Sequence, residues 1–72
     1  MKGKLEFKLP EEKEEFDYAC KGADLFCAVT TFDEDLRSKI KYAELDEKTR
    51  EAYQTIRDKL HEELAARDIA LW

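Results

Sequence analysis

Two apolar stripes at helical spacing, joined by a short turn, constrain the fold of this chain more than any other feature. The first recurs at intervals of three and four residues: Leu25, Val29, Phe32, Leu36 and Ile40. At about 100° per residue these side chains fall within an arc of about 80°, which is typical of a helix packed on a neighbouring helix. The second stripe consists of Thr49, Ala52, Tyr53, Ile56, Leu60 and Leu64. Because only a few residues separate the stripes, the sequence predicts an antiparallel hairpin of helices at about 24–42 and 46–67.

A further helix is predicted at about 10–21, ahead of the hairpin. Pro10 suits a first helical position, where its missing N–H costs nothing, and the acidic residues that follow it favour a helix N-terminus. Gly22 then suits a helix C-cap, and Asp24 and Asp46 suit the N-caps of the two later helices. The sequence therefore predicts three helices.

The two ends of the chain have the character of short strands. Residues 4–9, KLEFKL, alternate strictly between apolar and charged side chains, and residues 69–72, IALW, are apolar. A lone strand leaves its backbone groups unpaired, so we expect the two ends to meet, or a second molecule to supply the missing edge. The predicted fold class is α+β and mostly α, in a single small domain that covers residues 1–72.

Charge and hydropathy narrow the classes of partner. The net charge of −5 argues against direct nucleic-acid binding, which needs clustered Lys and Arg, and favours a protein partner with a basic surface. No apolar run approaches the length of about 18 residues that a membrane span needs, so we expect no membrane partner. The N-terminal residues lack the hydrophobic stretch of a signal peptide, which predicts a cytoplasmic location.

The two cysteines, Cys20 and Cys27, lack the paired spacing of a zinc site. On one continuous helix they would share a face but lie about 10 Å apart, beyond the reach of a disulfide. They are therefore predicted to be free, buried thiols in a reducing compartment. No metal or cofactor is predicted, because the spacing of a calcium-binding loop and the glycine-rich loops that hold phosphates are both missing.

The sequence offers little for catalysis. His61, the single histidine, lies on the flank of the second stripe with acidic residues nearby, which is typical of a solvated surface residue. No Ser or Cys nucleophile can be linked to it from sequence alone. The chain is therefore predicted not to be an enzyme.

Residues 32–42, FDEDLRSKIKY, change sign halfway along the segment. Asp33 and Arg37, and likewise Asp35 and Lys39, have the spacing and order of stabilising pairs within a helix, and the sign change also suits the helix dipole. Exposed aromatic residues next to basic ones are enriched where proteins bind one another. The candidate partner-binding residues are Asp33, Arg37, Lys39, Tyr42, Tyr18, Phe26 and Trp72.

Three segments give the chain a resemblance to known proteins. LPEEKEEFDYACKG, the aromatic-containing helix with FDEDLRSKIKY, and the Tyr-x-x-Ile-Arg-x-x-Leu helix resemble small hypothetical proteins encoded by tailed bacteriophages. These are packing motifs, and that group carries no assigned activity or functional residues. The resemblance implies expression inside an infected bacterium and action by binding a larger protein, such as a host enzyme or an immune component.

Two hypotheses follow for the function. The first is a non-enzymatic protein that binds a basic surface on a host or phage protein, as an inhibitor of the anti-CRISPR kind or of a host enzyme. The second is a self-assembling structural or accessory protein, such as a homodimer. The unpaired N-terminal strand and the apolar C-terminus suggest this hypothesis.

Overall fold

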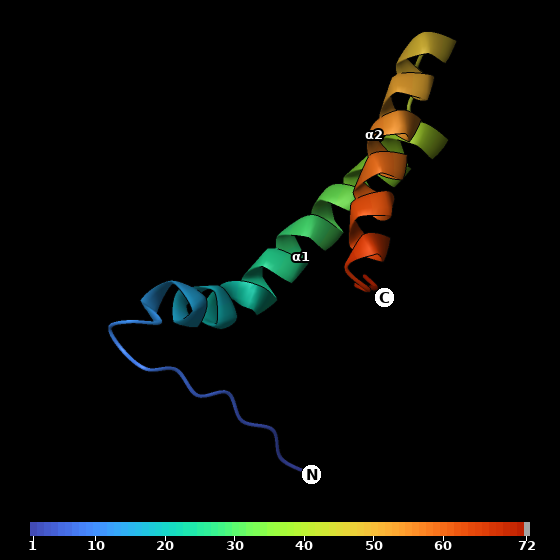
Figure 1. The fold of residues 1–72 in the computed structure, drawn as a ribbon. Coiled ribbons are helices and arrows are strands. Elements are labelled where there is room, and N and C mark those ends of the chain that lie inside the picture. Colours follow the sequence, from blue (N-terminus) through green and yellow to red (C-terminus); the bar gives the residue numbers. More distant parts are fainter. Residues whose placement is uncertain (72) are drawn as a thin grey trace.

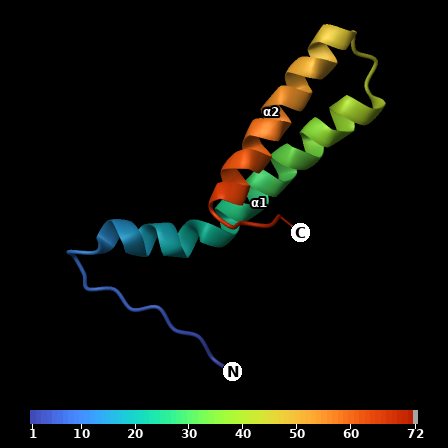
Figure 2. The same ribbon diagram turned by 45° about the vertical axis from the view of Figure 1, so that its right-hand side comes forward.

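The structure, a computed structural model, describes residues 1–71, and two helices make up most of them. α1 spans Lys13–Tyr42 and α2 spans Glu47–Ala66. α2 runs antiparallel to the second half of α1 and packs along it as a helical hairpin (Figure 1). The first half of α1 extends past the end of α2 and turns away from the hairpin (Figure 2).

The prediction of two separate helices at 10–21 and 24–42 is wrong, because α1 is continuous through Gly22. A helix that ends on glycine normally places that glycine in the left-handed region, and no glycine here has a positive φ. A glycine inside a helix costs about 1 kcal/mol relative to alanine. The good helix formers on both sides outweigh that cost, so Asp24 lies inside the helix and does not act as an N-cap.

The predicted strands are also wrong, since residues 1–71 contain two helices and no strand. Residues 4–9 are extended but have no strand partner, and their one aromatic contact is Phe7 against Phe16 of α1, with ring centroids 5.8 Å apart. Residues 69–71 do not pair with them and fold back onto α1. Trp72, the last residue of the predicted C-terminal strand, lies outside the described residues.

The hairpin turn is held by its own side chains. Asp46 caps α2 as predicted, because its Oδ1 accepts a hydrogen bond from the Thr49 amide at 2.8 Å. Arg50 donates hydrogen bonds to the carbonyl oxygens of Ile40 and Ala43, each at 3.1 Å. These carbonyls lie at the end of α1, where no further turn of helix can satisfy them. Arg50 therefore joins the start of α2 to the end of α1.

The C-terminal end of α2 reverses the chain. Asp68 has a φ of 56°, and the amide of Ile69 donates to the carbonyl oxygen of Leu64 at 2.9 Å. The amide of Asp68 donates to the carbonyl oxygen of Ala65 at 3.1 Å, which completes a Schellman motif with aspartate in the position usually taken by glycine. The reversal brings Leu71 onto α1, where it is buried.

Asp68→Gly is expected to raise the free energy of unfolding by about 0.5–1 kcal/mol, because glycine adopts the left-handed conformation without the steric cost of a Cβ. Urea unfolding followed by helical circular dichroism measures the change. Asp24→Gly, the same substitution inside α1, is the matched control and is expected to lower stability. A loss of stability in both variants would contradict the assigned reversal.

The buried core is small. Among the described residues the buried apolar side chains are Leu36 and Leu71. Four residues of the two predicted stripes are exposed instead: Leu25, Phe32, Ala52 and Ile56. A single pair of helices can enclose only the line of side chains that points directly at the partner helix, so the flanks of both stripes remain exposed.

Candidate functional site

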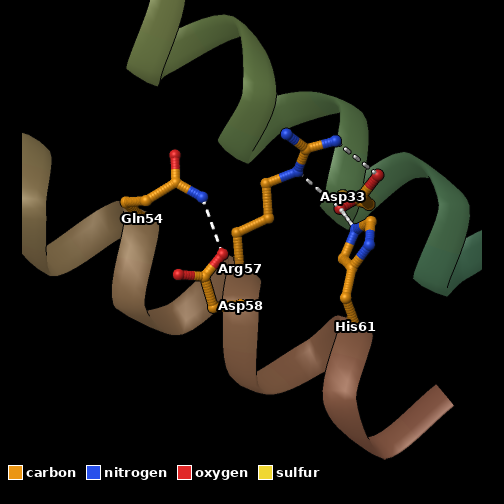
Figure 3. A network of polar contacts seen from close by, with 5 residues as sticks. All are labelled: Asp33, Gln54, Arg57, Asp58 and His61. Atoms are coloured by element: carbon orange, nitrogen blue, oxygen red, sulfur yellow. Dashed lines mark hydrogen bonds and ion pairs between the residues drawn. The ribbon is translucent and has the colours of Figure 1, made fainter. Parts of the chain in front are cut away.

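A charged cluster lies at the centre of the helix pair. Asp33 of α1 is fully buried, and its Oδ1 lies 2.9 Å from Nε of Arg57 and 2.7 Å from Nε2 of His61 (Figure 3). Its Oδ2 accepts a longer hydrogen bond of 3.4 Å from Arg57 Nη2. Arg57 and His61 are four residues apart on α2, so both side chains lie on the side that meets α1. The cluster therefore connects the two helices.

The partners of Asp33 keep its carboxylate charged. Burial by itself raises the pKa of Asp33, but the hydrogen bonds and charges of Arg57 and His61 outweigh burial, so the pKa lies below its ordinary value. The hydrogen bond to Asp33 in turn raises the pKa of Arg57. Since a buried carboxylate is costly without partners, Asp33 fixes the position of α2 along α1.

The cluster corrects two predictions. Asp33 was predicted to pair with Arg37 on an exposed helix face and to bind a partner, but it is buried between the helices. His61 was predicted to be a solvated surface residue, but its side chain is only 38% exposed and contacts Asp33. Nor does Asp35 pair with Lys39 among the ion pairs of residues 1–71.

A shallow polar hollow opens beside the cluster. It has a volume of about 180 Å³ and is lined by Gln54, Arg57, Asp58 and His61. Gln54 Nε2 donates to Asp58 Oδ1 at 2.8 Å along one edge of α2 (Figure 3). A second hollow that includes His61 is otherwise lined by Leu64, Ala65, Ile69, Ala70 and Leu71. Neither hollow has a described Ser, Thr, Cys or Tyr in its lining.

The stability of the hairpin is expected to fall in acid. A carboxyl whose pKa is lower in the folded state contributes stability above its unfolded pKa of about 4, and loses it as the pH falls through the folded value. Between about pH 5 and pH 3 the free energy of unfolding should therefore decrease. Urea titrations at fixed chain concentration measure it. Asp33→Asn should flatten this dependence, whereas Asp35→Asn, at an exposed position, should retain it; equal slopes in both variants would contradict the assignment.

The hairpin has one apolar face, and the cluster allows its position to be derived. Asp33 and Arg57 point at each other, so they fix the rotation of both helices. Phe32 and Ile56 each precede one of these residues and are rotated from it by about 100° around their helix. In an antiparallel pair, both rotations lead to the same side of the hairpin. Further residues fall on this side by the same count. We call this side the apolar face, formed by Leu25, Phe32 and Leu36 of α1 and by Tyr53, Ile56 and Leu60 of α2.

The opposite side of the hairpin is polar. Glu34 and Asp58 follow Asp33 and Arg57 in the sequence and are rotated by about 100° in the other direction. Their side chains therefore point away from the apolar face. The polar hollow lies on this side. The hairpin is therefore amphipathic across its two flat sides, with Phe32 half exposed and Ile56 46% exposed on the apolar one.

An apolar groove continues from the hairpin towards the bend of α1. It has a volume of about 290 Å³ and is lined by Gly22, Leu25, Phe26, Val29, Leu64, Ile69 and Leu71. Phe26, a predicted partner-binding residue, is 42% exposed at this groove. Since Leu25 lines the groove and also belongs to the apolar face, the groove and the face form one apolar surface.

The other predicted binding residues do not form one site. Tyr42 is exposed at the C-terminal end of α1. Tyr18 is exposed near the N-terminal end of the same helix, with its hydroxyl 3.3 Å from Glu14 Oε1. Arg37 and Lys39 are both exposed but point to different sides of α1, about 160° apart. Trp72 lies outside the described residues. The structure thus does not bring these described residues together on one face of the hairpin.

The cysteines and acidic residues do not form a metal centre within residues 1–71. Cys20 and Cys27 are free, as predicted, but both are exposed and not buried. No group of three or more His, Cys, Asp or Glu side chains in the described part of the chain is arranged to hold a metal ion.

Neither helix, over the described residues, is both long and apolar enough to cross a membrane. Comparison of the chain with protein-family models, with curated proteins and with solved structures found no match.

Proposed function

We propose that this protein is a non-enzymatic binding protein, which acts by contacting a larger protein. The single observation that carries the proposal is the amount of large apolar surface exposed on regular helices, on the projecting half of α1 as well as on the apolar face and the adjoining groove. Exposed apolar patches rimmed by polar residues mark protein interaction sites in general. On this proposal the buried charged cluster is structural, and it holds the two halves of the binding surface in register.

The partner class follows from charge and from the phage resemblance. A net charge of −5 favours a partner with a basic surface and disfavours nucleic acid as a direct ligand. We propose a phage-type role in the cytoplasm of an infected bacterium, as an inhibitor of a host enzyme or of an immune component. The projecting first half of α1, which exposes Phe16 and Tyr18 on different sides, gives such a partner contacts outside the hairpin.

Affinity capture from bacterial lysate, quantified by mass spectrometry, tests the proposal. The tagged full chain is expected to retain a larger protein in stoichiometric amount. A variant with Phe16→Glu and Tyr18→Glu should lose that protein, whereas a variant with Phe16→Leu and Tyr18→Phe, which keeps both side chains apolar, should retain it. The absence of a stoichiometric partner, or equal capture by all three proteins, would contradict the proposal.

A second candidate function, self-assembly, is favoured by the excess of exposed surface. The two functions are compatible, because an assembled protein can present its projecting segments to a different partner.

A further inference from the structure

The single chain exposes far more surface than a compact protein of its mass. Its accessible surface is 6436 Å², whereas a compact monomer of 8.5 kDa exposes about 4,700 Å². The radius of gyration is 16.9 Å, against about 11 Å for a compact chain of this length. Residues 1–12, which lie outside the helices, and the projecting half of α1 account for part of the excess, and the uncovered hairpin accounts for the rest.

The apolar face of the hairpin is an uncovered apolar area on two regular helices. Phe32 and Ile56 lie at its centre, next to the buried Leu36. By helical register, charged residues of both helices fall outside it, along its rim or on the polar side. Lys39 on the rim of α1 and Glu63 on the rim of α2 have opposite signs.

We propose that a second copy of this chain covers the apolar face, so that two hairpins pack face to face as a four-helix bundle. This inference rests on the proposed function, since it specifies one of the protein contacts through which the chain acts. Helices in such bundles pack through apolar stripes of the kind that Phe32, Leu36, Ile56 and Leu60 form. A two-fold axis through the face brings the same patch of both copies together, which a self-complementary apolar surface allows.

The charge pattern favours a second copy over a basic partner. Stable homodimers bury about 1,000–2,500 Å² on each chain, and the uncovered hairpin accounts for one part of the excess of about 1,700 Å² over a compact monomer. A basic partner would be drawn to the acidic groups, which lie away from the apolar face. The mixed signs of Lys39 and Glu63 on the rim also let two copies approach without uniform repulsion.

The proposed dimer leaves the N-terminal part of the molecule outside the bundle. The first half of α1 diverges from the hairpin, and residues 1–12 extend from its start (Figure 2). Each copy would then present its own Phe16 and Tyr18 to a larger partner. The hairpin thus supplies the dimer contact, and the projecting segments supply the partner contact.

Sedimentation equilibrium of the purified full chain, over a hundredfold range of concentration, tests the inference. The wild-type protein is expected to have twice the 8.5 kDa mass of one chain. Phe32→Glu and Ile56→Glu should each shift the dissociation constant upward by at least tenfold, because each places a charge at the centre of the interface. Tyr42→Glu, an equivalent change at an exposed aromatic residue off the face, should leave the mass unchanged.

A variant that loses the dimer can also unfold, so the wild-type protein supplies a second measurement. The midpoint of its thermal unfolding should rise with chain concentration if folding and dimerisation are linked. A monomeric mass with a concentration-independent midpoint would overturn the inference, as would a dimer that survives both Phe32→Glu and Ile56→Glu. Either result leaves capture of a larger partner through Phe16 and Tyr18 to be judged on its own, so failure of the dimer and failure of the proposed function are distinguishable.

Discussion

Arg57→Ala is expected to lower the free energy of unfolding by about 3–5 kcal/mol, the range for removing one member of a buried ion pair. Asp33 is fully buried, and Arg57 gives its carboxylate two of its hydrogen bonds. Without Arg57 the carboxylate keeps its contact with His61 but loses the permanent positive charge next to it. Urea unfolding monitored by circular dichroism, at one fixed chain concentration, measures the loss.

Arg37→Ala is the matched control for this prediction. Arg37 is exposed on α1, so its truncation is expected to change stability by less than about 0.5 kcal/mol. Arg57→Lys should fall between the two, because lysine keeps the charge but cannot offer the forked pair of N–H groups. If Arg57→Ala and Arg37→Ala have equal effects, the cluster does not hold the hairpin together.

Leu36→Ala is expected to cost about 2–5 kcal/mol, the usual range for truncating a buried leucine. Leu36 is 6% exposed, at the point where the apolar face meets the line of contact between α1 and α2. Calorimetric or urea unfolding of the purified variant measures the loss. Leu5→Ala, in the extended N-terminal segment, removes the same atoms from an exposed side chain and should be nearly neutral. A loss in Leu5→Ala as large as that in Leu36→Ala would show that the N-terminal segment belongs to the core.

The helical hairpin could be predicted because periodicity and cap chemistry agree there. The second helix starts after Asp46, which accepts the amide hydrogen bond of Thr49 as its residue type predicts. The continuity of α1 through Gly22 could not be predicted from the sequence. A single glycine permits a C-cap but does not require one, and its cost of about 1 kcal/mol is small beside the helical preference of its neighbours.

The sequence spacing places Asp33 and Arg57 among the inward-facing residues, but charged residues are normally assigned to the surface, so the buried cluster was not predicted. Val29, Asp33, Leu36 and Ile40 follow intervals of four, three and four, and so do Tyr53, Arg57, Leu60 and Leu64. Each stripe thus carries one charged residue at its centre, with opposite signs on the two helices. Phe32 lies about 100° from Asp33 around α1, so choosing Phe32 as the inward residue gave a plausible stripe but placed the ion pair in solvent.

The exposed apolar residues could not be placed from one chain. Leu25, Phe32 and Ile56 have the spacing of core residues, and that spacing is the same whether the core lies within one chain or between two. The strand-like pattern of residues 4–9 has the same ambiguity, because alternation indicates which side chains share a face but not whether a neighbouring strand exists.

Hydroxyl-radical footprinting of the full chain across a dilution series tests most directly whether the apolar face is a binding surface. Mass spectrometry would follow oxidation of Phe32 on the face and of Tyr42, an exposed aromatic residue off it. The account predicts that Phe32 becomes protected as the chain concentration rises while Tyr42 stays reactive. A constant ratio of Phe32 to Tyr42 oxidation at every concentration would contradict it.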